Sequence, residues 1–358
     1  MDYNSYRRKT REINVGGVRI GKNSRITVQS MTNTDTHDFD ATYRQISALS
    51  EAGCDIVRLA VPDVAAAECF AEMKRRGVSV PLVADIHFNY EIALAAIRCG
   101  ADKIRINPGN IGERKNTEAV VRACRERGIP IRIGVNSGSV EKGILAKYGA
   151  PCAEALAESA LYHASILEEL DFFDIALSVK ASDVSTMIEA NRILASKCDY
   201  PIHLGVTEAG ARRRAIVKSS VGIGALLAEG IGDTLRVSLT EDPIEEIYAA
   251  REILSALDLC EDRGMDIVSC PTCGRTKIDL IALVSEFESR ARDLGLDKKN
   301  IKVALMGCVV NGPGEAREAD IGIAGGVGEG LLFKKGEIIR KIKEDRLVTE
   351  LIEEIKKM

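Results

Sequence analysis

One pattern of apolar and polar positions repeats along the chain between residues 25 and 240. A short apolar run ends in a polar residue and leads into a longer segment whose apolar residues recur at helical spacing. Short apolar runs bounded in this way are typical of buried parallel strands. The pattern predicts eight strands, at residues 26–30, 55–60, 80–85, 102–107, 130–136, 173–180, 201–207 and 233–239.

The segments between these runs predict amphipathic helices. Steps of three and four positions place apolar side chains on one helical face, as in Ala66, Phe70 and Met73 or Met187, Ala190 and Leu194. Strand and helix signals that alternate predict parallel βαβ units. Eight such units favour an α/β fold of the (β/α)8 TIM-barrel type over an open doubly wound sheet.

The alternating pattern ends near residue 258, which suggests a second domain beyond it. A helix over 245–257 would close the barrel domain, residues 1–258, and 259–266 would be a linker. Residues 265–358 then form a small α/β domain with a helix at 278–295, a strand at 301–308, a glycine-rich turn region and a charged terminal helix. A body this small often needs an additional stabilising link, and a metal centre would supply one.

Composition narrows the class of protein. The chain has 358 residues and a formal charge of −4, and its 49 Lys and Arg residues are mixed with 53 Asp and Glu residues. This distribution predicts no general attraction to nucleic acid or to anionic lipid. Apolar runs are too short to span a membrane, and residues 1–17 lack the apolar core of a signal peptide. We therefore expect a soluble, cytoplasmic protein.

Cationic residues follow the predicted strands at their carboxyl ends, where barrel enzymes carry their chemistry. Each could pair with a nearby carboxylate, but five cations that converge on one barrel mouth favour a small, highly phosphorylated ligand. Asp85 and His87 could hold a metal, although such a pair more often forms a hydrogen bond. The converging cations are Arg58, Arg105, Arg132, Lys180 and Arg236, and Asn136, Glu208 and Ser238 occupy other strand ends.

Three of the ten cysteines stand out, because the other seven are isolated in segments that read as packing. Cys270 and Cys273 form the pair in SCPTCGRTK, and Cys308 follows later in MGCVVNGPGEA. Three interpretations stay open: a dithiol redox pair, a structural zinc site, and an iron–sulfur cluster. Three thiols without a fourth suit a cubane with one open iron better than structural zinc. Across the turn Asn-Gly-Pro-Gly, Glu315 could bring its weaker oxygen ligand to that iron.

Several motifs resemble those of one known enzyme family. They are VQSMTNTDT at 28–36, KIRINPGNIG at 103–112, GIGDTLRVSLT at 230–240, CPTCGR at 270–275 and GCVVNGPGEA at 307–316. With them the chain resembles the bacterial 4-hydroxy-3-methylbut-2-enyl diphosphate synthases of the methylerythritol phosphate route to isoprenoids. The resemblance extends over essentially the whole chain, without the extra domain that some relatives insert between barrel and cluster modules.

The resemblance implies a barrel domain followed by a reductase-like domain that holds a four-iron four-sulfur cluster. The family's cluster ligands fall on Cys270, Cys273, Cys308 and Glu315. Its diphosphate-binding and active-site positions fall on Arg58, Arg105, Arg132, Asn136, Lys180, Glu208, Arg236 and Ser238.

The resemblance also implies the reaction and the partners. The family reduces 2-C-methyl-D-erythritol 2,4-cyclodiphosphate in two one-electron steps, with ring opening and loss of water, to 4-hydroxy-3-methylbut-2-enyl diphosphate. For this reaction we expect Glu208 to be the proton donor, with an ion pair to one of the arginines as its structural alternative, and Glu315 to be an exchangeable ligand that the substrate displaces. Electrons would come from a flavodoxin or a ferredoxin, and a head-to-tail homodimer is expected.

Two other classes remain as alternatives on the residues alone. The first is a redox-neutral barrel lyase or transferase that acts on a phosphorylated substrate and carries a structural zinc knuckle at the cysteine pair. The second is a binding module in which a zinc knuckle is attached to an inert barrel. Both predict a colourless protein, whereas an iron–sulfur protein is brown.

Overall fold

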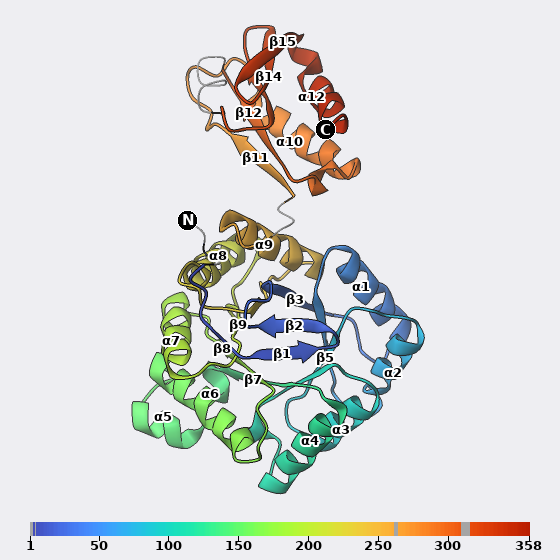
Figure 1. The fold of residues 1–358 in the computed structure, drawn as a ribbon, viewed down its shortest axis with the longest axis vertical. Helices are drawn as coiled ribbons and strands as arrows, with labels where there is room; N and C mark the ends of the chain where they lie inside the picture. The colour runs from blue at the N-terminus through green and yellow to red at the C-terminus, as the bar shows by residue number, and fades with distance from the viewer. Residues whose placement is uncertain (1–2, 4, 261–263, 309–315) are drawn as a thin grey trace. The chain divides into compact units, whose positions relative to one another are not determined.

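The computed structural model describes residue 3 and residues 5–260, 264–308 and 316–358 (Figure 1). The chain divides into two compact units, residues 1–260 and 261–358. Each unit is described by itself below.

The first unit is a parallel barrel, and its eight strands lie where the sequence pattern predicts them. Their order around the sheet is β8-β7-β6-β5-β4-β3-β10-β9. A parallel bridge between Leu177 and Ile202 joins the first and last strands of this order. The predicted barrel is therefore confirmed, with β3 at Thr27–Met31, β4 at Ile56–Ala60, β5 at Leu82–Asp85, β6 at Lys103–Ile106, β7 at Ile131–Asn136, β8 at Ile175–Lys180, β9 at His203–Leu204 and β10 at Thr234–Leu235.

Helices surround the barrel strands as an outer ring (Figure 1). All residues of the two stripes named from the sequence are fully buried. Met187, Ala190 and Leu194 lie in one helix, whereas Ala66 lies in the turn before the helix that holds Phe70 and Met73. The helices are α1 at Phe39–Glu51, α2 at Glu68–Arg75, α3 at Tyr90–Arg98, α4 at Arg114–Arg127, α5 at Lys142–Tyr148, α6 at Ala153–Glu168, α7 at Val184–Lys197, α8 at Arg212–Ala228 and α9 at Pro243–Ala256.

A short hairpin that the sequence analysis did not predict closes the amino end of the barrel. Its strands, β1 at Glu12–Val15 and β2 at Val18–Gly21, are antiparallel and joined through Gly16 and Gly17. Both glycines have positive φ, 56° and 95°, as a two-residue hairpin turn requires. Apolar side chains of the hairpin pack against residues near the starts of β4, β5 and β8, namely Ile56, Val83 and Ala176. Ligand access is thereby left to the carboxyl ends of the strands.

The second unit is a five-stranded mixed sheet covered by helices. Strands β11, β12 and β13 are parallel, and β14 and β15 continue the sheet antiparallel to their neighbours. Phe287, Leu305, Ile323 and Leu351 lie in its core. The elements are β11 at Met265–Ser269, α10 at Leu280–Asp293, β12 at Ile301–Met306, β13 at Ile321–Gly325, β14 at Glu329–Lys334, β15 at Glu337–Lys343 and α12 at Leu347–Lys356.

The expectation of only a glycine-rich turn region between 308 and the terminal helix was wrong for residues 321–343, which form three strands. Strand β13 is buried throughout and β15 is mostly exposed, so neither shows the alternation of apolar and polar positions that identifies a half-buried strand. Among the described residues, no helix combines the length and the apolar character that a membrane-spanning segment requires.

Candidate active site

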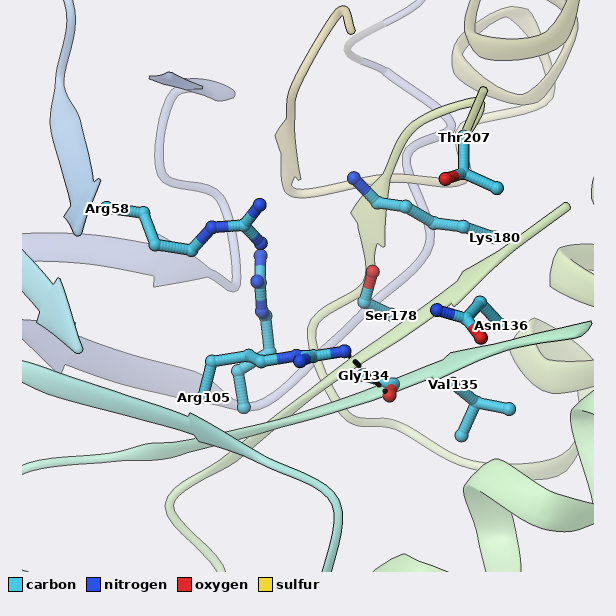
Figure 2. Close-up of a pocket in the computed structure, with 9 residues that line it drawn as sticks. Arg58, Arg105, Gly134, Val135, Asn136, Ser178, Lys180 and Thr207 are labelled. Atoms are coloured by element: carbon cyan, nitrogen blue, oxygen red, sulfur yellow. Dashed lines mark hydrogen bonds between the residues drawn. The ribbon is translucent and has the colours of Figure 1, made fainter. Parts of the chain in front are cut away.

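Charged side chains fill the carboxyl half of the barrel interior. Along each strand, one set of alternate residues packs against the helices, and the other set points inward. On β6 and β7 the outward set is apolar, whereas the inward set carries Arg105 and Arg132. Figure 2 shows Arg58 and Lys180 reaching from opposite sides toward one pocket. The lining consists of Arg58, Arg105, Arg132, Gly134, Val135, Asn136, Ser178, Lys180 and Thr207.

Two glycines give the long cationic side chains their space. A Cβ atom at Gly134 would lie 2.6 Å from Nε of Arg105, and one at Gly205 would lie 2.7 Å from Nζ of Lys180. Both separations are shorter than a van der Waals contact. Any larger residue at these two positions would therefore displace a cation from the pocket.

Asp85 orients two of the arginines. Its carboxylate lies 3.1 Å from Arg105 Nη1 and 3.6 Å from Arg58 Nε. Burial alone would raise the pKa of the Asp85 carboxyl, but the two guanidinium groups outweigh burial and lower it to about 2. His87 is exposed, with Nε2 3.9 Å from Asp85 and Nδ1 3.5 Å from Arg105. Asp85 thus forms ion pairs with the arginines. Within the described residues, no group of three His, Cys, Asp or Glu side chains is placed to hold a metal ion.

Arg236 is held by a carboxylate that the sequence analysis did not name. Glu246, on α9, receives hydrogen bonds from Arg236 Nε at 2.9 Å and from Nη2 at 2.8 Å. Ser30 and the backbone of Leu239 also donate to this carboxylate. With only 2 % of its side chain exposed, Glu246 fixes the guanidinium at the end of β10. In the sequence, Glu246 is noticeable only as an acidic residue on the inner face of α9.

Arg132 and Lys180 have no carboxylate within ion-pair distance among the residues that the structure describes. Arg132 is 1 % exposed, and its Nε and Nη1 atoms make no hydrogen bond to described residues. Burial, together with nearby Arg58, moves the pKa values of both side chains well below their ordinary range. Buried cations of this kind favour an anionic ligand that neutralises them.

A further cation, Lys103, lies one inward position before Arg105 on the same strand. Its side chain is fully buried, and Nζ has no hydrogen-bond partner among the described residues. His203 and Gln29 are also buried in the barrel, and His203 Nε2 and both amide atoms of Gln29 lack partners there as well. Alternation along DKIRIN, which puts Lys103 and Arg105 on one face, could have revealed this residue from the sequence.

Glu208 and Ser238 are close in sequence to residues of the site, but they do not line the pocket. Glu208 follows the lining residue Thr207 and is exposed. Its φ of 52° lies in the left-handed region, which is strained for a residue with a Cβ atom. Ser238 is half-buried, two positions after Arg236.

The loops that carry Cys270 and Cys308 lie side by side in the second unit. Cys270 follows β11 and Cys308 follows β12, and these parallel strands pair Ser269 with Leu305. The backbone N–H of Gly307 donates to Cys270 Sγ at 3.3 Å. In return, the N–H of Lys277 donates to the Gly307 carbonyl at 3.0 Å. The loops of the two cysteine motifs, far apart in sequence, are therefore neighbours joined by backbone hydrogen bonds.

Cys273 lies in the same loop pair, with its thiol exposed. Hydrogen bonds from the backbone and side chain of Arg275 lower its thiol pKa. A Cβ atom at Gly307 would lie only 2.8 Å from Thr276, so the cysteine loop packs directly on the strand end before Cys308. Glu315 lies outside the described residues. Cys270, Cys273 and Cys308 are soft donors on two adjacent loops, and this donor chemistry fits an iron–sulfur centre. The described residues do not, however, bring the three thiols together as one metal-binding group.

Comparison with known proteins extends over both units. The family model described as the GcpE TIM-barrel domain matches residues 10–251, and that of the GcpE protein C-terminal domain matches residues 266–357. A Clostridium perfringens relative named 4-hydroxy-3-methylbut-2-en-1-yl diphosphate synthase (flavodoxin) is 60% identical over 97% of this chain and 98% of its own length. A Fusobacterium nucleatum relative of the same name is 58% identical over 98% of this chain and 97% of its own length.

Among solved structures, the barrel resembles type I 3-dehydroquinate dehydratase from Clostridium difficile. The TM-score is 0.52 at 13% identity, over 70% of this chain and 98% of that chain, which is a likeness of fold alone. The family matches and the near full-length identities confirm the resemblance inferred from the motifs. The chain belongs to the GcpE family, whose TIM-barrel and C-terminal domain models together match most of its length.

Proposed function

We propose that this chain is a flavodoxin-dependent 4-hydroxy-3-methylbut-2-enyl diphosphate synthase. Its substrate would be 2-C-methyl-D-erythritol 2,4-cyclodiphosphate. Two electrons enter, a carbon–oxygen bond to the cyclic diphosphate breaks, and a hydroxyl group takes a proton and leaves as water. The names of relatives at 57–60% identity support this assignment. The structural observation that carries it is the surplus of buried cations around Arg132 and Lys180.

The diphosphate would lie in the pocket of Figure 2, against Arg58, Arg105, Arg132 and Lys180. Asp85 holds two of these arginines in place before the ligand arrives. Ring opening frees a diphosphate oxygen that can carry a further negative charge. Cations fixed in advance at that position stabilise the developing charge without having to reorganise. Asn136, Arg236 and Ser238 would complete the polar contacts.

Glu208 is the proposed proton donor to the departing hydroxyl group. Its strained backbone, next to a pocket-lining residue, supports a functional reason for a carboxylate at this position. In the Glu208→Gln variant, anion binding should survive while turnover falls by about 100-fold or more. Unchanged turnover would remove Glu208 from this role.

Cys270, Cys273, Cys308 and Glu315 would hold a four-iron four-sulfur cluster. When bound, it supplies electrons to the substrate one at a time. Glu315 would be the weakest of these ligands, because a carboxylate oxygen binds iron more weakly than a thiolate does. Flavodoxin is the proposed electron donor and ferredoxin the alternative. The proposal includes a cytoplasmic, head-to-tail homodimer.

Metal analysis of anaerobically purified protein tests the proposed chemistry against the zinc alternative. We expect about four iron and four sulfide per chain and a brown colour that dithionite bleaches. Cys308→Ser should lose the iron, whereas Cys124→Ser, at a packing cysteine of α4, should retain it. Glu315→Ala should keep a cluster but turn over poorly. Stoichiometric zinc without iron or sulfide would overturn the proposal in favour of a redox-neutral enzyme.

A further inference from the structure

Lys103 is a buried amine for which the described structure provides no partner. Its side chain is 0% exposed, and Nζ makes no hydrogen bond to any described residue. A buried amine without a counterion is destabilised when charged and is easier to bury when neutral. Lys103 therefore differs from Arg58 and Arg236, which have carboxylates close by.

The groups that surround Lys103 make its protonation still less favourable in the absence of a ligand. Arg132 and Arg58 repel a proton on Lys103, as His203 would when protonated, and Arg105, Lys180 and Arg236 add positive charge to the same barrel interior. The described carboxylates nearby are Asp85 and Glu246, and both bind arginines. Burial, with Arg132 and Arg58, accordingly moves the pKa of Lys103 well below its ordinary value.

An anion in the pocket would reverse this balance. It would bring negative charge to Arg132, whose repulsion disfavours a proton on Lys103. We infer that Lys103 takes up a proton when the pocket binds an anion, so that Lys103 acts as an inner, ligand-dependent cation of the site. The inference rests on the proposed binding of diphosphate in this pocket.

Proton uptake here would match the charge change of the proposed reaction. A cyclic diphosphate has two ionisable oxygens, and ring opening creates a third. A proton on Lys103 adds positive charge within the barrel interior without another contact to the ligand. Lys103 would thus be a positioning residue that adjusts the charge of the site, while Arg132 and Lys180 touch the ligand.

Calorimetric titration of the full-length protein with methanedisulfonate tests this inference. The probe has two anionic groups spaced like those of a diphosphate, and it does not titrate near neutral pH, so any proton exchanged comes from the protein. Binding heats measured in buffers of different ionisation enthalpy give the number of protons taken up. We expect uptake by the unaltered protein, and about one proton less per chain in Lys103→Met. Lys115→Met, at an exposed lysine of α4, should match the unaltered protein.

The pH dependence keeps the test decisive even if Lys103→Met does not fold. At low pH the amine is already protonated before the ligand arrives, so uptake by the unaltered protein should disappear as pH falls. Binding without proton uptake at neutral pH would overturn the inference, as would equal uptake in Lys103→Met, or a loss found in His203→Gln instead. Failure of methanedisulfonate and pyrophosphate to bind at all would contradict the proposed anion pocket itself, and the inference with it.

Discussion

Glu246 binds both nitrogen positions that Arg236 presents on one side of its guanidinium group, at 2.9 and 2.8 Å. The two residues come from different elements, since Arg236 follows β10 and Glu246 lies on α9. Arg132, in the same barrel, has no such partner among the described residues. The site therefore contains two kinds of buried arginine, one neutralised within the protein and one without a described carboxylate partner.

Arg236→Met should strongly destabilise the protein. The substitution leaves the Glu246 carboxylate buried without its cation, which typically lowers the free energy of unfolding by about 3–5 kcal/mol. Urea denaturation measures the effect. The double variant Arg236→Met/Glu246→Gln should recover most of the stability but not the turnover. Equal losses in the single and double variants would show that the ion pair is not the cause.

Arg132→Met should have the opposite effect on stability. It removes a buried charge that no described carboxylate balances, so we expect the free energy of unfolding to rise by about 1–3 kcal/mol. Turnover should fall by about 100-fold or more, because a donor to the developing charge is lost. The same denaturation and turnover assays apply. A destabilised Arg132→Met variant would mean that Arg132 is already neutralised in the free protein.

Asp85 should contribute stability that depends on pH. Its pKa is lowered to about 2 in the folded protein, below its ordinary value of 3.8. A lowered carboxyl pKa stabilises the folded state above the unfolded pKa, and this stabilisation is lost as pH falls toward 2. Asp85→Asn should thus lower the free energy of unfolding at pH 6 by about 2 kcal/mol, a difference that shrinks below pH 4. Urea denaturation across that range checks it, and a difference independent of pH would contradict the assignment.

Cys273 should be the most reactive of the cysteines compared here in protein prepared without metal. Its thiol is exposed, and Arg275 lowers its pKa, whereas burial raises the thiol pKa of Cys54 and Cys124 to about 12 and that of Cys69 to about 11. Iodoacetamide reacts with thiolates, so alkylation at pH 7 followed by mass spectrometry should label Cys273 first. Cluster assembly should protect it. Equal labelling of Cys54 and Cys273 would argue against this environment.

The sequence pattern predicted the barrel well because the strand and helix periodicities differ and alternate. The predicted strands alternate with helices whose buried apolar face, such as Met187, Ala190 and Leu194 of α7, is visible in the sequence. The hairpin at residues 12–21 was missed because two strands of four residues give too short a pattern. Strands β13–β15 were missed because the burial of a strand depends on its neighbours in the sheet, which the sequence does not display.

The cations that line the pocket could be predicted from the sequence, because polar residues at the ends of predicted strands are visible there. Glu246 was missed because its role depends on pairing across the fold. Lys103 was missed although the alternation along its strand places it on one face with Arg105. Glu246 neutralises Arg236 from a helix, and Lys103 is notable only because its amine has no described partner. The pairing of each cation depends on the tertiary structure. It distinguishes arginines that are neutralised by a carboxylate of the protein from those that have no described carboxylate partner.

The proposed reaction can be measured as single-turnover reduction of 2-C-methyl-D-erythritol 2,4-cyclodiphosphate by anaerobically prepared, iron-loaded protein. Reduced flavodoxin is added in known amounts, and the linear product is quantified. We expect one 4-hydroxy-3-methylbut-2-enyl diphosphate for every two electrons consumed, with almost none from Arg132→Met. If iron-loaded protein binds the cyclodiphosphate but forms no product at any amount of reduced flavodoxin, the proposed function is wrong.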